Sequence, residues 1–436
     1  IRSVAVGTDA LLLNTTGDDN SALGKSALQD NTTGSDNTAT GNYALANNTT
    51  ASNNTANGNN SLEANTTGAN LVAVGHLALT ANTTGSNNTA VGKSSLAANT
   101  TGELNVAVGG FVLDTNTTGT QNTGVGYAAL DASTTGNYNT AIGAYTLDAN
   151  TTGHHNTGLG KSSLSANTTG EYNTAVGSNS LAASTTASAN VAMGYAAGNA
   201  VTTGAHNAAL GYGAFALATT AEQTVSVGSY TLDACTTGGS YSTAIGYAAL
   251  TSVTTATHNT GVGHSALSLT TTGASNVAVG NGALDNNTTA SSNVAVGRDA
   301  LGANTTGAEN TAVGFEALKE NTTAQQNTAV GRLALLENTT GDFGTAVGSA
   351  ALDANTTGQS NTGIGAEALS ANTTGGNNTA VGRRALAANT TASSNTAVGL
   401  ESLYANTTGS EVTAVGKGAL ATNTTGVRNV AVGVEA

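Results

Sequence analysis

The sequence contains no proline and no tryptophan, and it has a single cysteine, Cys235. One cysteine excludes an internal disulfide framework. Charged residues make up 8% of the chain and aromatic residues 3%, whereas a typical globular domain carries about 25% charged residues. Disordered chains, in contrast, are rich in proline, glutamate and lysine. These absences argue against both an ordinary globular domain and ordinary disorder, and they favour a repetitive fold.

Basic residues are scarce as well. Lysine and arginine number 11, scattered over 436 residues, and with 25 acidic residues they give a formal net charge of −14. A nucleic-acid-binding protein needs clustered lysine and arginine to displace counterions from phosphates. No apolar run approaches the roughly 18 residues of a membrane-spanning helix, and no signal-peptide pattern follows Ile1. We therefore expect no nucleic-acid partner and no membrane insertion of this segment.

What the chain does contain is a 17-residue repeat, N-T-A-V-G-x-x-A-L-x-A-N-T-T-G-x-x, whose positions are numbered 0 to 16 below. Position 0 falls at Ser3, Asn20, Asn37 and so on to Asn429, and one of the 25 intervals, after Cys235, is 18 residues long. Position 4 is glycine in all 26 occurrences, and position 8 is leucine in 23 of 25. Such self-similarity at a fixed period indicates a solenoid.

The repeat favours strands over helices. Seventeen residues are too few for two packed helices, and glycine, asparagine and threonine are weak helix formers. We predict an all-β fold, a parallel β-solenoid (β-roll) of about 25 coils with 17 residues per coil, as a single continuous domain over residues 1–436. One strand is expected at positions 0–4 and a second at about positions 7–11. Glycine at position 4 is expected where the backbone takes a positive φ.

Alternate residues of a strand face opposite sides. We assign positions 1 and 3 (threonine or valine, and valine) and positions 8 and 10 (leucine and alanine) to the interior of the coil. Asparagines at positions 0 and 11 are expected to form ladders from coil to coil; simple turn propensity of asparagine is the alternative. Position 3 is polar at Thr40 and Asn57, which predicts a soft spot there.

Irregular coils are expected around residues 190–258. In that segment Gly198 and Phe215 replace the leucine of position 8, and the extra residue of the long interval lies among Gly239, Ser240 and Tyr241. We predict a local bulge or bend.

Position 2 admits only small residues: alanine 21 times, glycine four times and serine once. Since this position faces away from the valine of position 3, we place it outside the coil, pressed against other copies of the chain. The alternative is that alanine packs inside a thin single chain.

Residues 105–109 and 429–433, both N-V-A-V-G, resemble the Asn-Ser-Val-Ala-Ile-Gly core of head repeats in trimeric autotransporter adhesins. The longer unit with Asn-Thr-Thr-Gly is similar to repeats of tail-fibre-like and surface proteins of bacteria and their viruses. The resemblance implies a left-handed roll, a homotrimer along the solenoid axis, and an extracellular location at a cell or virion surface. The 17-residue period departs from the shorter adhesin unit, so handedness and trimer state are implied only.

One acidic feature is a candidate metal site. Asp114, Asp131 and Asp148 occupy position 9 in successive coils, so they are expected to stack at about 4.8 Å. Like charges directly opposite one another are destabilising, and a calcium ion bridging the carboxylates would relieve the repulsion. The alternative is a solvated stripe with screened repulsion.

No catalytic or cofactor-binding constellation recurs, and all six histidines fall at the variable positions 5, 15 and 16. We therefore predict that the chain is not an enzyme and has no cofactor, apart from the calcium hypothesis. The most favoured function is a structural and adhesive fibre, as the shaft or head of a trimeric surface adhesin or tail fibre. A cell-surface or glycan receptor stays open as a partner.

Two other functions remain as alternatives. One is a polymerising extracellular filament. The other is an ice-binding solenoid, for which the Thr-Thr pair at positions 12 and 13 would supply one outward threonine per coil.

Overall fold

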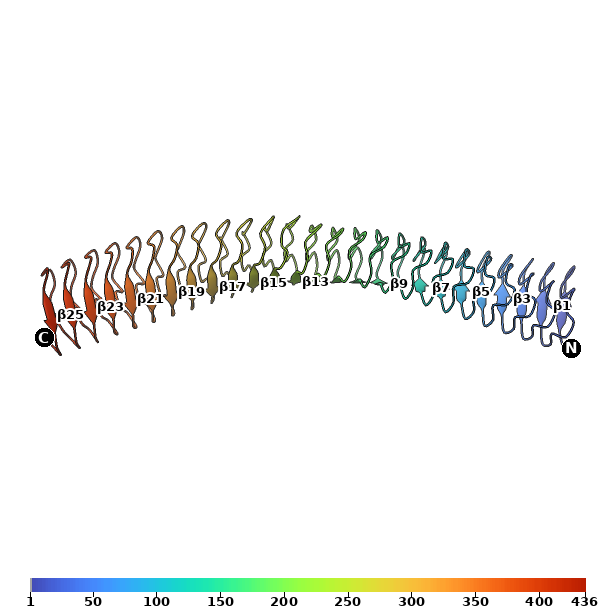
Figure 1. Ribbon diagram of the computed structural model, residues 1–436, viewed down its shortest axis with the longest axis horizontal. Helices are drawn as coiled ribbons and strands as arrows, with labels where there is room; N and C mark the ends of the chain where they lie inside the picture. Colours follow the sequence, from blue (N-terminus) through green and yellow to red (C-terminus); the bar gives the residue numbers. More distant parts are fainter. Residues whose placement is uncertain (1) are drawn as a thin grey trace. The chain divides into compact units, whose positions relative to one another are not determined.

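The computed structural model describes residues 2–436 and contains, within them, 26 short strands and no helix. By its internal contacts the chain divides into two compact units, Ile1–Thr220 and Ala221–Ala436. Each unit is a stack of coils in which every coil contributes one three-residue strand (Figure 1). The prediction of an all-β parallel solenoid with 17 residues per coil is therefore confirmed.

The strands of the first unit are β1 (Val4–Val6), β2 (Ser21–Leu23), β3 (Thr38–Thr40), β4 (Thr55–Asn57), β5 (Val72–Val74), β6 (Thr89–Val91), β7 (Val106–Val108), β8 (Thr123–Val125), β9 (Thr140–Ile142), β10 (Thr157–Leu159), β11 (Thr174–Val176), β12 (Val191–Met193) and β13 (Ala208–Leu210). Those of the second unit are β14 (Val225–Val227), β15 (Thr243–Ile245), β16 (Thr260–Val262), β17 (Val277–Val279), β18 (Val294–Val296), β19 (Thr311–Val313), β20 (Thr328–Val330), β21 (Thr345–Val347), β22 (Thr362–Ile364), β23 (Thr379–Val381), β24 (Thr396–Val398), β25 (Thr413–Val415) and β26 (Val430–Val432).

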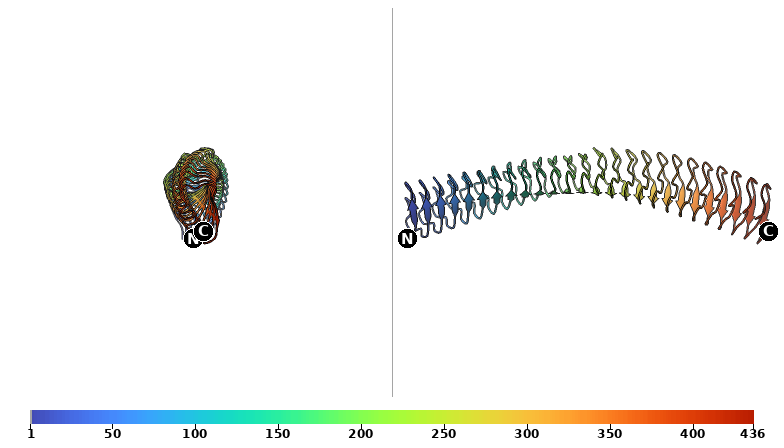
Figure 2. Two further views of the ribbon diagram at one scale, coloured as in Figure 1. Left: turned by 90° about the vertical axis from the view of Figure 1, so that its left-hand side faces the viewer. Right: turned by 180° about the vertical axis from the view of Figure 1, so that it is seen from behind.

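Within each unit every strand pairs in parallel with the strand of the next coil. The register joins equal repeat positions, as where Thr311 lies opposite Thr328 and Val313 opposite Val330. Seen from behind, each strand is followed by a loop that leads into the next strand (Figure 2). Identical residues therefore form columns along each unit, spaced at about the 4.8 Å of neighbouring strands.

Positions 7–11 do not form the second strand that the pattern predicted. The residues at positions 6 and 8 are left-handed instead: φ is 55° at Ser26 and 52° at Leu28. This conformation is uncommon for a bulky side chain. It allows two adjacent residues, Ala27 and Leu28, to be fully buried, which an extended strand cannot do because its side chains alternate. The buried alanine is thus that of position 7, and the alanine of position 10 is only partly buried, as at Ala183.

The inside and outside of the one strand are also opposite to the prediction. Ala329 at position 2 is 0% exposed, whereas Val330 at position 3 is 37% exposed. Alanine therefore packs inside a thin coil, which was the alternative hypothesis, and the valine faces outward. The polar residues Thr40 and Asn57 lie on the same outward side as the valines, so they leave no defect in the core and the predicted soft spot loses its physical basis.

The glycines of position 2 show why this position stays small. A Cβ built onto Gly363 would lie 3.2 Å from Cγ of Leu352, the leucine of the preceding coil. At Gly158 it would lie 2.5 Å from Cγ2 of Thr146, and Thr146 is larger than the alanine or serine usual at position 7. The interior is close-packed, so the extra bulk of Thr146 is accommodated because the next coil carries Gly158 in place of alanine.

Both asparagine columns form ladders, as predicted. At position 11, Asn48 Nδ2 donates to Asn31 Oδ1 (2.8 Å) and to the carbonyl of Ala51 (3.0 Å). At position 0, Asn37 Nδ2 donates to Asn20 Oδ1 (3.1 Å) and to the same Ala51 carbonyl (2.9 Å). The amides of Asn48 and Asn37 thus join two coils and also close their own corners, which satisfies polar groups that would be costly to bury unpaired.

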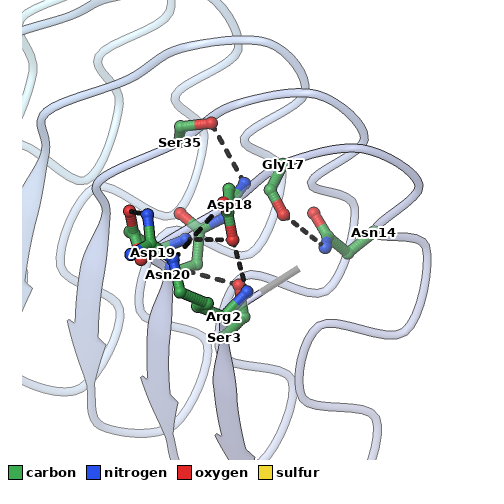
Figure 3. A network of polar contacts seen from close by, with 8 residues as sticks. All are labelled: Arg2, Ser3, Asn14, Gly17, Asp18, Asp19, Asn20 and Ser35. Atoms are coloured by element: carbon green, nitrogen blue, oxygen red, sulfur yellow. Dashed lines mark hydrogen bonds and ion pairs between the residues drawn. The ribbon is translucent and has the colours of Figure 1, made fainter.

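Figure 3 shows how the first coils of the first unit use the same contacts. Asn14 Nδ2 donates to the carbonyl of Gly17 (2.9 Å), and the backbone N–H of Asn20 donates to Ser3 Oγ (3.1 Å), because serine replaces asparagine at this position 0. Arg2 forms an ion pair with Asp19, which lies 17 residues later at the same position of the next coil (3.0 Å).

The 18-residue coil of the second unit places its extra residue in a corner. Gly239 has a φ of 80°, a turn follows at residues 240–241, and the N–H of Gly239 donates to the carbonyl of Ala256 (2.7 Å). Strands β14 and β15 still pair in full, with Val225 opposite Thr243. The predicted irregularity therefore takes the form of a corner bulge that leaves the strand register intact.

Candidate functional surfaces

The outward side of the strands is the most extensive candidate surface. We call the side chains at positions 1 and 3 of each unit the β face. Position 1 is mostly threonine or valine and position 3 is mostly valine. Members more than one third exposed include Val106, Val108, Ile142, Leu159, Val191 and Met193 in the first unit, and Val277, Val279, Val296, Val313, Val330, Val347 and Ile364 in the second.

No charged residue occupies position 1 or 3 in any coil. Long, uncharged, apolar sheet faces are rare on isolated soluble proteins, whose largest apolar patches span about 300–600 Å². The β face instead runs through every coil of each unit. Charge is confined to the corners and to positions 9 and 10, so the sequence keeps it off the β face.

The three candidate metal residues lie in one column at position 9. Burial raises the pKa of the Asp131 carboxyl. Burial, and then the charge of Asp131, raise that of Asp114 and of Asp148. One carboxylate oxygen of Asp148, Oδ1, is buried without a hydrogen-bond partner. Within residues 2–436, no group of three or more histidine, cysteine, aspartate or glutamate side chains is arranged to hold a metal ion. Binding of calcium by this column therefore stays a prediction.

Replacing Asp131 with asparagine should stabilise the protein at neutral pH. Because the folded-state pKa lies above the unfolded value, the protonated carboxyl is the form that folding favours, and this contribution is lost as pH rises through the folded pKa. Asp131→Asn should thus raise the free energy of unfolding at pH 7 by less than about 1 kcal/mol, since the site is partly solvated, and the difference should vanish near pH 3.

Urea unfolding of both proteins at the two pH values, without metal, measures this effect, with Asp36→Asn at an exposed corner as the control. A gain that persisted at pH 3 would contradict the electrostatic explanation. Adding calcium tests the metal hypothesis: it should stabilise the wild type and leave Asp131→Asn unaffected.

The histidines and tyrosines form columns in the corners. At position 16, the rings of Tyr138 and His155 stack with centroids 4.7 Å apart and planes 2° apart, and His155 and Tyr172 stack at 5.0 Å and 5°. At position 5, Tyr195 stacks on Tyr212 at 5.4 Å. None of these residues stands out singly in the sequence, but their 17-residue spacing is the signal that places them in contact.

A surface hollow of about 220 Å³ lies beside the three-ring stack. It is lined by Asn137, Tyr138, His154, His155, Glu171 and Tyr172.

Cys235 takes the place of a ladder asparagine. Its Sγ–H donates to the carbonyl of Gly238 (2.7 Å), which is the corner contact that asparagine makes elsewhere. Burial raises the pKa of this thiol to about 12. A thiol of this kind is a poor nucleophile at neutral pH because the thiolate is the reactive form.

The Thr-Thr corner presents one outward column. Thr32 Oγ1 at position 12 donates to the carbonyl of Thr49 in the next coil (2.9 Å), whereas Thr33 at position 13 is exposed. An asparagine precedes most of these pairs and is buried in the ladder, as Asn31 is.

No family model matches the chain, and no curated protein is significantly similar to it. Among residues 2–436 there is also no helix long and apolar enough to cross a membrane.

Proposed function

We propose that this chain is a structural segment of an adhesive extracellular fibre, and that copies of the chain pack together through the β face. The observation that carries the proposal is the continuous, uncharged column of threonine and valine on the outward side of the strands. Covering a surface of this kind with another copy of the chain removes apolar area from water and so lowers the free energy.

The thin interior supports the same conclusion. Most coils bury one leucine together with small alanines, as Leu318, Ala312 and Ala317 do in one coil. Ordering a coil costs backbone entropy for all 17 residues. The β face is still partly exposed in the single chain, as Val330 is at 37%, so covering it with another copy adds to the apolar burial that offsets this cost. Assembly would therefore stabilise the fold as well as build the fibre.

The motif shared with adhesin heads favours three chains around one axis. In such an assembly the β faces of the copies meet at the axis, and the charged corners stay in water. The alanine of position 2 takes no part in this contact, because it lies inside its own coil.

Sedimentation equilibrium of the wild type tests the proposal. Its mass should be at least twice the 42.1 kDa of one chain, and three times that value for three chains around one axis. A variant with Val313, Val330 and Val347 replaced by lysine, called the triple-lysine variant below, should sediment as a monomer with unchanged far-ultraviolet circular dichroism, because like charges and lost apolar area disfavour the contact.

The matched control replaces Asn281, Ser349 and Ala366 with lysine, at position 5, where other coils already carry lysine. This control should assemble like the wild type. A monomeric wild type, or a triple-lysine variant that still assembles, would refute packing through the β face.

A second function is favoured by the same face. Two parallel columns of β-branched side chains on a regular sheet form a flatter surface than the single threonine column of the corner, which makes ice binding more plausible than the corner alone did. If the wild type is monomeric, thermal hysteresis that disappears in the triple-lysine variant would establish this second function.

A further inference from the structure

The geometry points to a saccharide-binding groove on the first unit, formed by positions 15 and 16 of three successive coils and closed by the face of Tyr172. The ligand class is a pyranose sugar of a glycan. The inference rests on the proposed function in taking the fibre to be adhesive, but its residues lie outside the β face.

One wall of the groove is aromatic. Tyr138, His155 and Tyr172 stack nearly parallel, with centroid separations of 4.7 and 5.0 Å. Backbone hydrogen bonds between coils fix their spacing: the N–H of His155 donates to the carbonyl of Asn137 (3.1 Å), and the N–H of Tyr172 donates to the carbonyl of His154 (3.2 Å). Tyr138 and Tyr172 remain 50% and 59% exposed. The wall is therefore ordered by the coil stack and open to a ligand.

The other wall is polar and has fixed orientation. The backbone N–H of Asn137 donates to Nδ1 of His154 (2.9 Å), so the neutral imidazole carries its proton on Nε2 and can donate from there. The Asn137 side chain is held in turn, since its Oδ1 accepts from the N–H of Thr120 (2.7 Å). Glu171 adds a carboxylate acceptor to the same hollow. Donors and acceptors thus line the same hollow as the aromatic rings.

The stack ends at an open ring face. In the next coil position 16 is Ala189, whose N–H donates to the carbonyl of Glu171 (2.9 Å), so it occupies the next place in the column. Alanine has no ring to cover Tyr172. The space that a fourth ring would fill is therefore left beside Glu171 and the exposed face of Tyr172.

A sugar fits these features better than a flat aromatic molecule does. The inner ring faces of the stack already cover one another, and the outer face of Tyr172, on the side of Ala189, can accept a pyranose through its C–H groups. Glu171 lies beside this first sugar ring. His154 and Asn137 line the same hollow one and two coils further along, at about 5 and 10 Å, where their polar groups suit the hydroxyl groups of the following sugars of a glycan. Ligand sites usually combine such apolar walls with a few well-placed polar groups.

Saturation-transfer NMR with methyl β-glucopyranoside, methyl β-galactopyranoside and methyl N-acetyl-β-glucosaminide tests the groove. At least one pyranoside should receive saturation from the wild type. Ala189→Tyr, which completes the ring column with a residue that position 16 carries elsewhere, should reduce the signal at least tenfold, and Tyr172→Ala should do the same. Ser292→Tyr, at position 16 of the second unit, is the matched control and should leave the signal unchanged.

Absence of saturation transfer to all three pyranosides would overturn the inference, as would equal signals from the wild type and Ala189→Tyr. Binding of indole in place of the pyranosides, lost in Ala189→Tyr, would assign the slot to flat aromatic ligands and overturn the saccharide class. Repeating the saturation-transfer experiment with the triple-lysine variant separates the two proposals, because sugar binding should persist in the monomer whether or not the wild type assembles.

Discussion

Replacing Gly280 with alanine should destabilise the second unit by about 3 kcal/mol or more, since a strained backbone conformation and a steric clash combine at this position. Gly280 has a φ of 141°, which side chains rarely adopt. A Cβ there would lie 2.5 Å from the carbonyl oxygen of Gly297 and 2.7 Å from its carbonyl carbon. These are backbone atoms of the next coil, so they cannot rotate away.

The backbone has little freedom to relax around Gly280. Its N–H donates to the carbonyl of Val262 in the preceding coil (2.8 Å), and the residue follows directly on β17. A shift at Gly280 would break that bond or the pairing of β17 with its neighbours. This explains why position 4 is glycine in all 26 occurrences.

Gly273→Ala is the matched control. Gly273 occupies position 14 of the preceding coil, and a Cβ there would also crowd the carbonyl of the next coil. Its φ is ordinary, however, and alanine is the natural residue at Ala256 and Ala290 in the coils on either side. Urea unfolding should show a change below about 1 kcal/mol for this variant. Equal losses for both variants would show that crowding alone, and not the positive φ, selects glycine at position 4.

The sequence was sufficient to predict the coil, because a 17-residue period with short β-branched segments and turn residues has few other structural solutions. The asparagine ladders also followed from the period, since stacking puts Asn31 next to Asn48 and Asn20 next to Asn37. Residues that recur every 17 positions stack into a column along the coils, whatever backbone conformation each coil adopts.

Which side of the strand faces the interior could not be predicted from hydrophobicity. Valine is more apolar than alanine, so placing Val330 inside and Ala329 outside was the natural assignment, and it is wrong. The interior is already filled by the leucine of position 8 and the alanine of position 7. The pairing of Thr146 with Gly158, twelve residues apart, carries the information in the sequence, because a larger residue at one site coincides with a missing side chain at the other.

The left-handed leucine was beyond prediction for a different reason. Intrinsic preferences disfavour a positive φ for leucine, by about 1–2 kcal/mol, yet Leu28 and its equivalents adopt it. Burial of the side chain and the backbone bonds to the next coil, such as Leu28 N–H to the carbonyl of Ala44 (3.0 Å), outweigh that preference. Tertiary packing here overrides the local conformational rule.

The candidate sites were predicted less well than the fold. The aspartate column was recognised because three identical residues recur at one position, whereas Tyr138, His155 and Tyr172 differ in type and were not connected. Their common position 16 would have joined them, but the open face of Tyr172 becomes visible only when the column and Ala189 are placed in space.

The free energies of unfolding of two variants at adjacent residues, each made in the triple-lysine variant, test most directly whether alanine lies inside and valine outside. Ala278 is fully buried and Val279 is 37% exposed, although they are adjacent in β17. Ala278→Lys should lower the free energy of unfolding by at least about 3 kcal/mol, because it puts an unpaired charge into a packed interior. Val279→Lys should lower it by less than about 1 kcal/mol. The opposite order, with Ala278→Lys tolerated and Val279→Lys unfolded, would contradict the structure and the assembly proposed from it.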